Sequence, residues 1–166
     1  MQFPTVAGKN LERNRFHLPR DLEGTLNVLL IAFQRWHQSL VDTWIPLLQQ
    51  METKYPGFRY YELPTLQELN PLSRVFINEG MRAGIPDPTA RERTITLYID
   101  KLGFRQALDL PHEEDIYVLL VNRQGQILWR VAGELTPEKT ESLVSAIEDQ
   151  DIAAGTHDPG RNPEHA

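Results

Sequence analysis

The sequence predicts an α/β fold built on a partly parallel sheet, and three patterns carry this prediction. The run TLNVLLIAF (25–33) is continuous, apolar and rich in branched residues, as is typical of a strand buried on both faces. From Ser39 onward the apolar residues recur with the period of one helix face. Near the end, YVLLVNRQGQILWRVAG (117–133) indicates a hairpin with its turn at Gln124-Gly125. Strands and helices therefore alternate along the chain.

Residues 3–24, ahead of the first buried strand, alternate turn residues with short apolar groups. Gly8-Lys9-Asn10 indicates a turn, and LPRDLEG (18–24) indicates a second turn that leads into the strand. We expect a hairpin or loop here.

A helix is expected after the strand, ending at residues 54–57. Ser39 with Asp42 three residues later is a capping-box arrangement at its start. Pro46 lies inside the helix and should kink it. The residues expected on its apolar face are Leu40, Trp44, Leu47, Leu48 and Met51.

The rest of the chain continues the alternation. The expected elements are a strand over 58–66, a helix over 70–85, a strand over 93–99, a short helix over 100–110 and a last helix from Thr136-Pro137-Glu138, with Leu143, Val144 and Ile147 facing inward. After about residue 150 the sequence is Gly, Pro, His and charge without periodicity. We therefore expect one domain over 1–150 and a disordered tail over 151–166.

The composition excludes several classes of function. The 166 residues include no cysteine, so disulfides, thiolate nucleophiles and Cys-ligated metal centres are excluded. With a net charge of −6 and no long basic run, nucleic acid is not an expected partner. The longest apolar run is too short for a membrane-spanning helix, and MQFPTVAGKN resembles no secretory or mitochondrial presequence. A soluble cytoplasmic protein is expected, or a mitochondrial matrix protein where a presequence has been removed.

The order of elements resembles the thioredoxin-like fold, and local residues support the resemblance. Thioredoxins carry an apolar strand, an aromatic turn with the motif WCGPC and a helix with a proline, and Phe33, Trp36 and Pro46 match this pattern. The resemblance implies a three-layer sandwich, a central mixed β-sheet with helices on both faces. It places His37-Gln38-Ser39-Leu40 where the redox motif stands, so both redox sulfurs are missing.

The family's second hallmark is a cis-proline before the third core strand, and Asp115-Ile116 stands there instead. A cis bond without proline costs about 3 kcal/mol, so this bond should be trans.

A more specific resemblance is to the mitochondrial ATP synthase assembly factors, which are similar to redoxins stripped of their cysteines. Three stretches carry it, together covering about half the chain: LPRDLEG (18–24), VDTWIPLL (41–48) and the module YVLLVNRQGQILWRVAGELTPE (117–138). The resemblance implies a redox-inactive protein that binds another protein or an extended peptide segment, such as a chaperone in ATP synthase assembly.

On this interpretation the candidate binding site is the rim of the former redox site. Its residues are Trp36, His37, Gln38, Ser39, Asp115 and Ile116. We expect Trp36 and His37 to be exposed there, with Leu40 buried in place of the second cysteine. No catalytic residue, cofactor or metal is expected, and the oligomeric state is left open.

Other candidate sites have simpler interpretations. His112-Glu113-Glu114-Asp115 offers four ligand types, but consecutive positions rarely converge on one ion, so a solvated loop is expected. Arg82, Arg91 and Arg93 are expected to form a salt-bridged surface. Trp44 is expected in the core, whereas Trp129 fits either side of its strand. Phosphate-binding and nucleophile-elbow motifs are absent.

Two functions are compatible with the sequence. The first is the binding module just described. The alternative is a non-thiol enzyme that uses the same groove, with His37 or the acidic loop as acid or base. A closed pocket with a perturbed titratable group would favour the enzyme, and an open surface rimmed by tryptophan and leucine would favour the binding module.

Overall fold

The computed structural model describes residues 1–68 and 93–156, with side chains described as far as residue 150. Two compact units emerge, Met1–Leu135 and Thr136–Ala166. The first contains the sheet and the candidate site, and the second contains the last helix. The expected helix over 70–85 lies outside the described residues.

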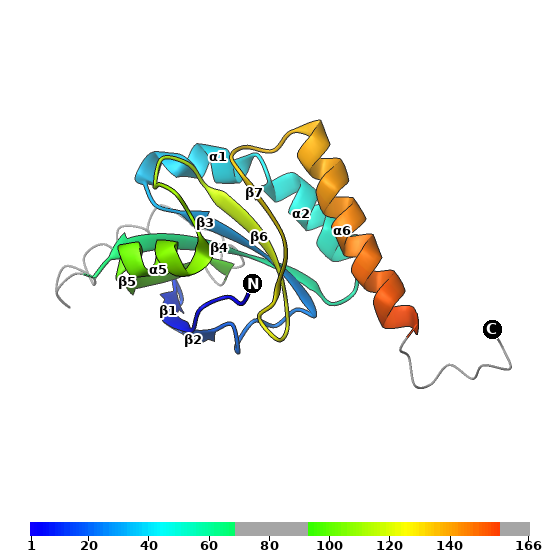
Figure 1. Cartoon of the computed structure of the whole chain (residues 1–166), viewed down its shortest axis with the longest axis horizontal. Helices are drawn as coiled ribbons and strands as arrows, with labels where there is room; N and C mark the ends of the chain where they lie inside the picture. The colour runs from blue at the N-terminus through cyan, green and yellow to red at the C-terminus, as the bar shows by residue number, and fades with distance from the viewer. Residues whose placement is uncertain (69–92, 157–166) are drawn as a thin grey trace, which may run out of the picture. The chain divides into compact units, whose positions relative to one another are not determined.

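Among the described residues of the first unit, a mixed sheet of seven strands forms the centre, in the order β2-β1-β5-β4-β3-β6-β7 (Figure 1). Strand β3 pairs in parallel with β4 and antiparallel with β6. The strands are β1 (Val6–Asn10), β2 (Arg15–Leu18), β3 (Leu26–Ala32), β4 (Phe58–Gln67), β5 (Ile95–Ile99), β6 (Tyr117–Asn122) and β7 (Ile127–Ala132). The expected mixed sheet is therefore confirmed.

Helices cover both faces of this sheet. Successive side chains of a strand point to opposite faces, so the apolar residues of one strand can pack against helices on either side. Leu29 and Ile31 of β3 share an apolar core with Phe104 and Leu108 of α5 (Lys101–Leu108). On the other face, Trp44 contacts the ring of Trp129 near the start of α2 (Ile45–Lys54). These are the three layers that the resemblance implied.

The first hairpin forms as expected, but its turn lies further along the chain. Gly8–Asn10 belongs to β1, and the chain reverses after Asn10 to pair β1 with β2. The side-chain Oδ1 of Asn10 accepts the backbone N–H groups of Glu12 and Asn14, and Arg13 takes a positive φ of 70°. The turn therefore lies after Asn10 and not at Gly8-Lys9-Asn10.

The helix expected from Ser39 is in fact two helices. A 3-10 turn η1 (Arg35–His37) leads into α1 (Gln38–Asp42), and α2 starts at Ile45. Pro46 occupies the first turn of α2, where its missing N–H costs nothing, so it marks a helix start rather than a kink. Ser39 lies within α1, and the capping box is formed by Gln34 and His37 instead.

The strand over 58–66, the strand near 93–99, the helix after Asp100 and the β6–β7 hairpin are confirmed. The last helix, α6 (Pro137–Thr156), begins where Thr136 Oγ1 accepts the Lys139 N–H, and Leu143 and Ile147 are buried. α6 extends to Thr156. Residues 157–166 lie outside the described part of the chain.

Candidate functional site: the turn between β3 and α1

His37 is the centre of the turn that follows β3, and its side chain is 0% exposed. Its Nδ1 accepts the backbone N–H groups of Phe33 at 3.0 Å and Gln34 at 3.2 Å. An imidazole nitrogen that accepts two hydrogen bonds carries no proton, so the neutral ring is protonated on Nε2. Burial lowers the pKa of His37, partly offset by the Glu114 carbonyl and the nearby carboxylates of Asp115 and Glu114.

The expectation that His37 lies exposed on the rim is therefore wrong. The ring turns inward because η1 leaves the Phe33 and Gln34 N–H groups without helical partners, and the imidazole supplies the acceptor. Leu40, expected to be buried, is only half-buried, and its neighbour Val41 lies in the core. Of the four positions from His37 to Leu40, the buried one is therefore the first and not the last.

Trp36 confirms the expected exposure, with 53% of its surface accessible. Its ring meets the His37 ring edge-on at 4.4 Å between centroids, and its Nε1–H donates to Gln34 Oε1 at 3.0 Å. Trp44 is fully buried, as expected, and donates to the Gly133 carbonyl at 3.0 Å. Trp129, which by its sequence fits either side of its strand, is half-buried against Trp44.

The structure brings the loop before β6 against this turn. Gln34 Nε2 donates to the Glu113 carbonyl at 2.7 Å. The Glu113 carboxylate pairs with Lys101 at 2.6 Å and with Arg105 at 3.3 Å, which ties the loop to α5. Glu113 is thus a structural anchor, contrary to the expected solvated loop, whereas His112 and Glu114 are exposed.

Asp115 and Ile116 lie in this loop as the resemblance implied, and their peptide bond is trans as expected. Ile116 is fully buried, so its side chain is not part of an accessible rim. Its N–H bonds the Asp115 carboxylate at 2.9 Å, and its carbonyl accepts the Gly133 N–H at 3.0 Å. Both backbone groups of Ile116 are therefore already used within the chain.

Gln38 and Ser39 are exposed on the outer side of the turn. Gln38 Nε2 donates to Asp42 Oδ1 at 2.9 Å and to Glu62 Oε1 at 3.0 Å, and Ser39 Oγ donates to the Trp36 carbonyl at 3.0 Å. Burial raises the pKa of the Glu62 carboxyl, the Gln38 hydrogen bond opposes this, and Asp42 adds to it. Glu62 was not foreseen, because a single glutamate within a strand pattern carries no local signal.

Gln34 and Glu113 were also missed as residues that build the site. A polar residue after a strand is too common to mark a function. Glu113 stands among several consecutive charged residues, and nothing in the sequence singles it out from them. Only the contact between two segments far apart in sequence identifies them.

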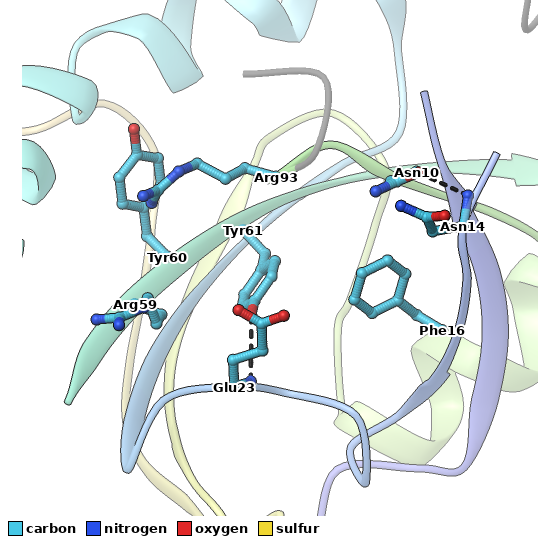
Figure 2. Close-up of a pocket in the computed structure, with 8 residues that line it drawn as sticks. All are labelled: Asn10, Asn14, Phe16, Glu23, Arg59, Tyr60, Tyr61 and Arg93. Carbon is cyan, nitrogen blue, oxygen red and sulfur yellow. Dashed lines mark hydrogen bonds between the residues drawn. The ribbon is translucent and has the colours of Figure 1, made fainter. Parts of the chain in front are cut away.

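A polar pocket of about 330 Å³ lies elsewhere in the unit, beside β4 and the first hairpin (Figure 2). Its residues are Asn10, Asn14, Phe16, Glu23, Arg59, Tyr60, Tyr61 and Arg93. Arg93 is paired with Glu52 and stacks over the Tyr60 ring at 4.5 Å, which agrees with the expected salt-bridged surface. Arg82 and Arg91 lie outside the described residues. The pocket includes no residue of the β3–α1 turn.

In chemical terms the turn lacks any thiol, and its one imidazole is buried with Nδ1 committed to the backbone. Within residues 1–68 and 93–150 no group of three or more His, Asp or Glu side chains is placed to hold a metal ion. Among the described helices none is long and apolar enough to cross a membrane. What the turn presents outward is a tryptophan ring beside polar side chains.

The fold and this turn define a thioredoxin-like protein without the redox cysteines. Similar solved structures are the thioredoxin domain of a thiol-disulfide oxidoreductase from Bacteroides vulgatus (17% identity, 89% of this chain and 95% of that chain, TM-score 0.54) and the pneumococcal exposed lipoprotein thioredoxin from Streptococcus pneumoniae (10% identity, 88% and 99%, TM-score 0.56). A thioredoxin-like protein from Aeropyrum pernix is similar at 13% identity over 87% and 89%, with a TM-score of 0.50. At these identities the likeness shows the fold alone.

The family follows from the sequence match. Residues 1–149 match the model of the ATP10 protein family, so the chain belongs to that family. This confirms the resemblance to the ATP synthase assembly factors that the sequence indicated. No curated protein sequence matches the chain.

Proposed function

We propose that this protein is a redox-inactive assembly factor that binds a polypeptide partner at the surface formed by Trp36, Gln38 and Ser39, here called the Trp36 surface. The observation that carries the proposal is the exposed Trp36 ring on a turn that has lost its thiols. Tryptophan is among the residues most enriched in the energetic centres of protein interfaces. Membership of the ATP10 protein family makes an ATP synthase subunit the partner to test first.

The rigidity of this surface supports the same role. The Trp36 ring is held by Gln34, Gln34 by the Glu113 carbonyl, and Glu113 by two cations of α5. A side chain already fixed in place loses little conformational entropy on binding, so more of its contact energy contributes to affinity. Main-chain pairing at Ile116 is not part of this mode, since its N–H and carbonyl are bonded within the chain.

The alternative enzyme is less well supported. A general acid or base must reach its substrate within hydrogen-bond distance, and His37 is fully enclosed with Nδ1 occupied. The binding surface therefore accounts for the arrangement better than a catalytic site at His37.

The proposal is tested by complementation in a strain of the source organism that lacks the gene. Assembled ATP synthase is measured on native gels. We expect the deletion to lower it, the wild-type chain to restore it, and Trp36→Ala to fail although the purified variant folds. Leu102→Ala is the matched control, because Leu102 on α5 is 55% exposed and contributes nothing to the Trp36 surface.

Photo-crosslinking supplies the direct readout. A photoreactive amino acid at position 36 should join an ATP synthase subunit, and the same group at position 102 should not. Unchanged ATP synthase in the deletion strain, or full rescue by Trp36→Ala, would refute the proposal.

A further inference from the structure

The hydrogen bonds of His37 make the turn sensitive to one proton. Nδ1 accepts both the Phe33 and the Gln34 N–H, so the neutral ring is the form that fits. Protonation places a second N–H on Nδ1, and an imidazolium has no acceptor left. The protonated ring would then face two backbone donors in a buried site, and both hydrogen bonds would be lost.

The consequence reaches the exposed ring next to it. Gln34 is the N-cap residue before η1 and accepts the Trp36 Nε1–H, and the Trp36 ring packs edge-on against the His37 ring. Once the imidazole leaves its place, Trp36 loses this packing partner, and the two N–H groups that fix the start of the turn lose their acceptor. One titratable group thus contacts the two N–H groups that start the turn and the exposed ring beside it.

We propose that neutral His37 holds the turn and the Trp36 surface in the closed arrangement seen here, which we call the latch. Protonation of His37 then opens the turn and abolishes partner binding. The link to binding rests on the function proposed above, whereas the opening is a property of the chain alone. Histidine is suited to this task because its ordinary pKa lies close to physiological pH.

The charges around the ring influence the pH at which the turn opens. Across the contact, the carboxylates of Glu114 and Asp115 favour the charged ring, but burial outweighs them and lowers the pKa. Glu113 is neutralised by Lys101 and Arg105, and Arg35 on η1 itself is exposed. The latch therefore stays closed at neutral pH and opens below the ordinary histidine pKa of about 6.5.

The sign follows from proton binding. The closed turn binds the proton less tightly than the open turn does, so acidification favours opening. Between the ordinary histidine pKa and the lowered pKa of the closed state, the ratio of closed to open turn falls about tenfold per pH unit, because one proton is linked to the change, and below that range it levels off. Partner affinity should fall with the same slope.

The opening is tested on the purified full chain by ¹H–¹⁵N spectra recorded from neutral to acidic pH. We expect the Phe33 and Gln34 amide signals to move together with one midpoint below the ordinary histidine value. The Gln124 and Gln126 amides are an internal reference, since they bond to the Asn122 side chain in a turn without histidine. Movement of both sets with one midpoint would mean global unfolding and would overturn the latch.

Three variants separate the latch from a general histidine effect. In His37→Asn the amide Oδ1 stands where Nδ1 stood and accepts the same N–H groups without titrating, so the transition should disappear. In His37→Leu no acceptor remains, so the two amides should have their open-state positions already at neutral pH. His112→Asn removes the exposed histidine of the adjacent loop and should keep the wild-type midpoint. A transition that persists in His37→Asn, or is lost in His112→Asn, would overturn the proposal.

A second readout follows Trp36 itself. With 5-fluorotryptophan in place of the three tryptophans, the ¹⁹F signal lost in Trp36→Phe identifies position 36, and buried Trp44 is the reference. The Trp36 signal should shift with the amide midpoint while the Trp44 signal stays unchanged. If the pH transition occurs as expected but Trp36→Ala still restores ATP synthase fully, only the binding function is refuted. If restoration depends on Trp36 but no pH transition is seen, only the latch is refuted.

Discussion

Two turns of this protein use the same device in different surroundings. In the β6–β7 turn, Asn122 Oδ1 accepts the backbone N–H groups of Gln124 at 3.1 Å and Gln126 at 2.9 Å. In the β3–α1 turn, His37 Nδ1 accepts the N–H groups of Phe33 and Gln34. The first group lies at the exposed end of a hairpin, and the second is fully enclosed.

The difference shows what burial adds to a hydrogen bond. Water can replace Asn122 as the acceptor for exposed N–H groups, whereas no solvent reaches the His37 site. Both turns are contacted by segments far away in sequence: the Gly125 carbonyl of the Asn122 turn accepts the Phe3 N–H at 2.8 Å, and Gln34 of the His37 turn donates to the Glu113 carbonyl. The two turns therefore differ in the burial of the acceptor and not in their dependence on distant contacts.

The largest expected effect is that of His37→Ala, which leaves two backbone N–H groups near the core without an acceptor. We expect the free energy of unfolding to fall by about 2–4 kcal/mol at neutral pH. Urea unfolding measures it, with an unchanged slope as the check on two-state behaviour. A loss within about 0.5 kcal/mol would place the ring on the surface and remove the contrast with Asn122.

Leu40→Ala should have a smaller effect, because Leu40 is half-buried and its truncation opens no closed cavity. We expect a loss of about 1 kcal/mol, below the roughly 2–5 kcal/mol of a fully buried leucine. The same urea experiment ranks it against His37→Ala. If Leu40→Ala proved the more damaging, the fourth position of the turn would be the buried one, as thioredoxin-like sequence alignment implied.

Asn122→Ala tests the exposed turn. In this variant the N–H groups of Gln124 and Gln126 form hydrogen bonds with water instead, and Gly125 with φ of 86° still supports the reversal of the chain. We therefore expect the free energy of unfolding to fall by about 0.5 kcal/mol. Its ratio to the His37→Ala loss is a measure of what burial contributes. Equal losses from the two variants would show that the acceptor matters and its burial does not.

Glu62→Gln should have the smallest effect and the opposite sign. Burial raises the pKa of Glu62, so the folded state holds this proton more tightly than the unfolded state. Its contribution to stability therefore falls as pH rises from the ordinary glutamate range through the raised pKa. The variant should be slightly more stable than wild type at neutral pH, and the gain should vanish in acid. Thermal unfolding across pH measures this, with exposed Glu138→Gln as the control.

The sequence determined those features of the fold that depend on neighbours along the chain. The buried strand β3, the β6–β7 hairpin with its turn at Gln124-Gly125, and the start of α6 follow from apolar periodicity, turn residues and Pro137. The missing cysteines could be read directly, and with them the loss of thiol chemistry. Trp36 was placed correctly because its position after a buried strand leaves it outside the helix face.

The tertiary structure decided what depends on contacts between distant segments. His37 and Trp36 are adjacent in sequence, yet one ring is enclosed and the other is exposed. Burial of His37 requires two N–H groups freed by η1 and the loop before β6, which Gln34 and Glu113 hold against it. The hydrogen bond between Gln38 and half-buried Glu62 of β4 is a contact of the same kind. A local pattern states which residues are apolar, but an enclosed polar group is stabilised by partners that only the fold brings to it.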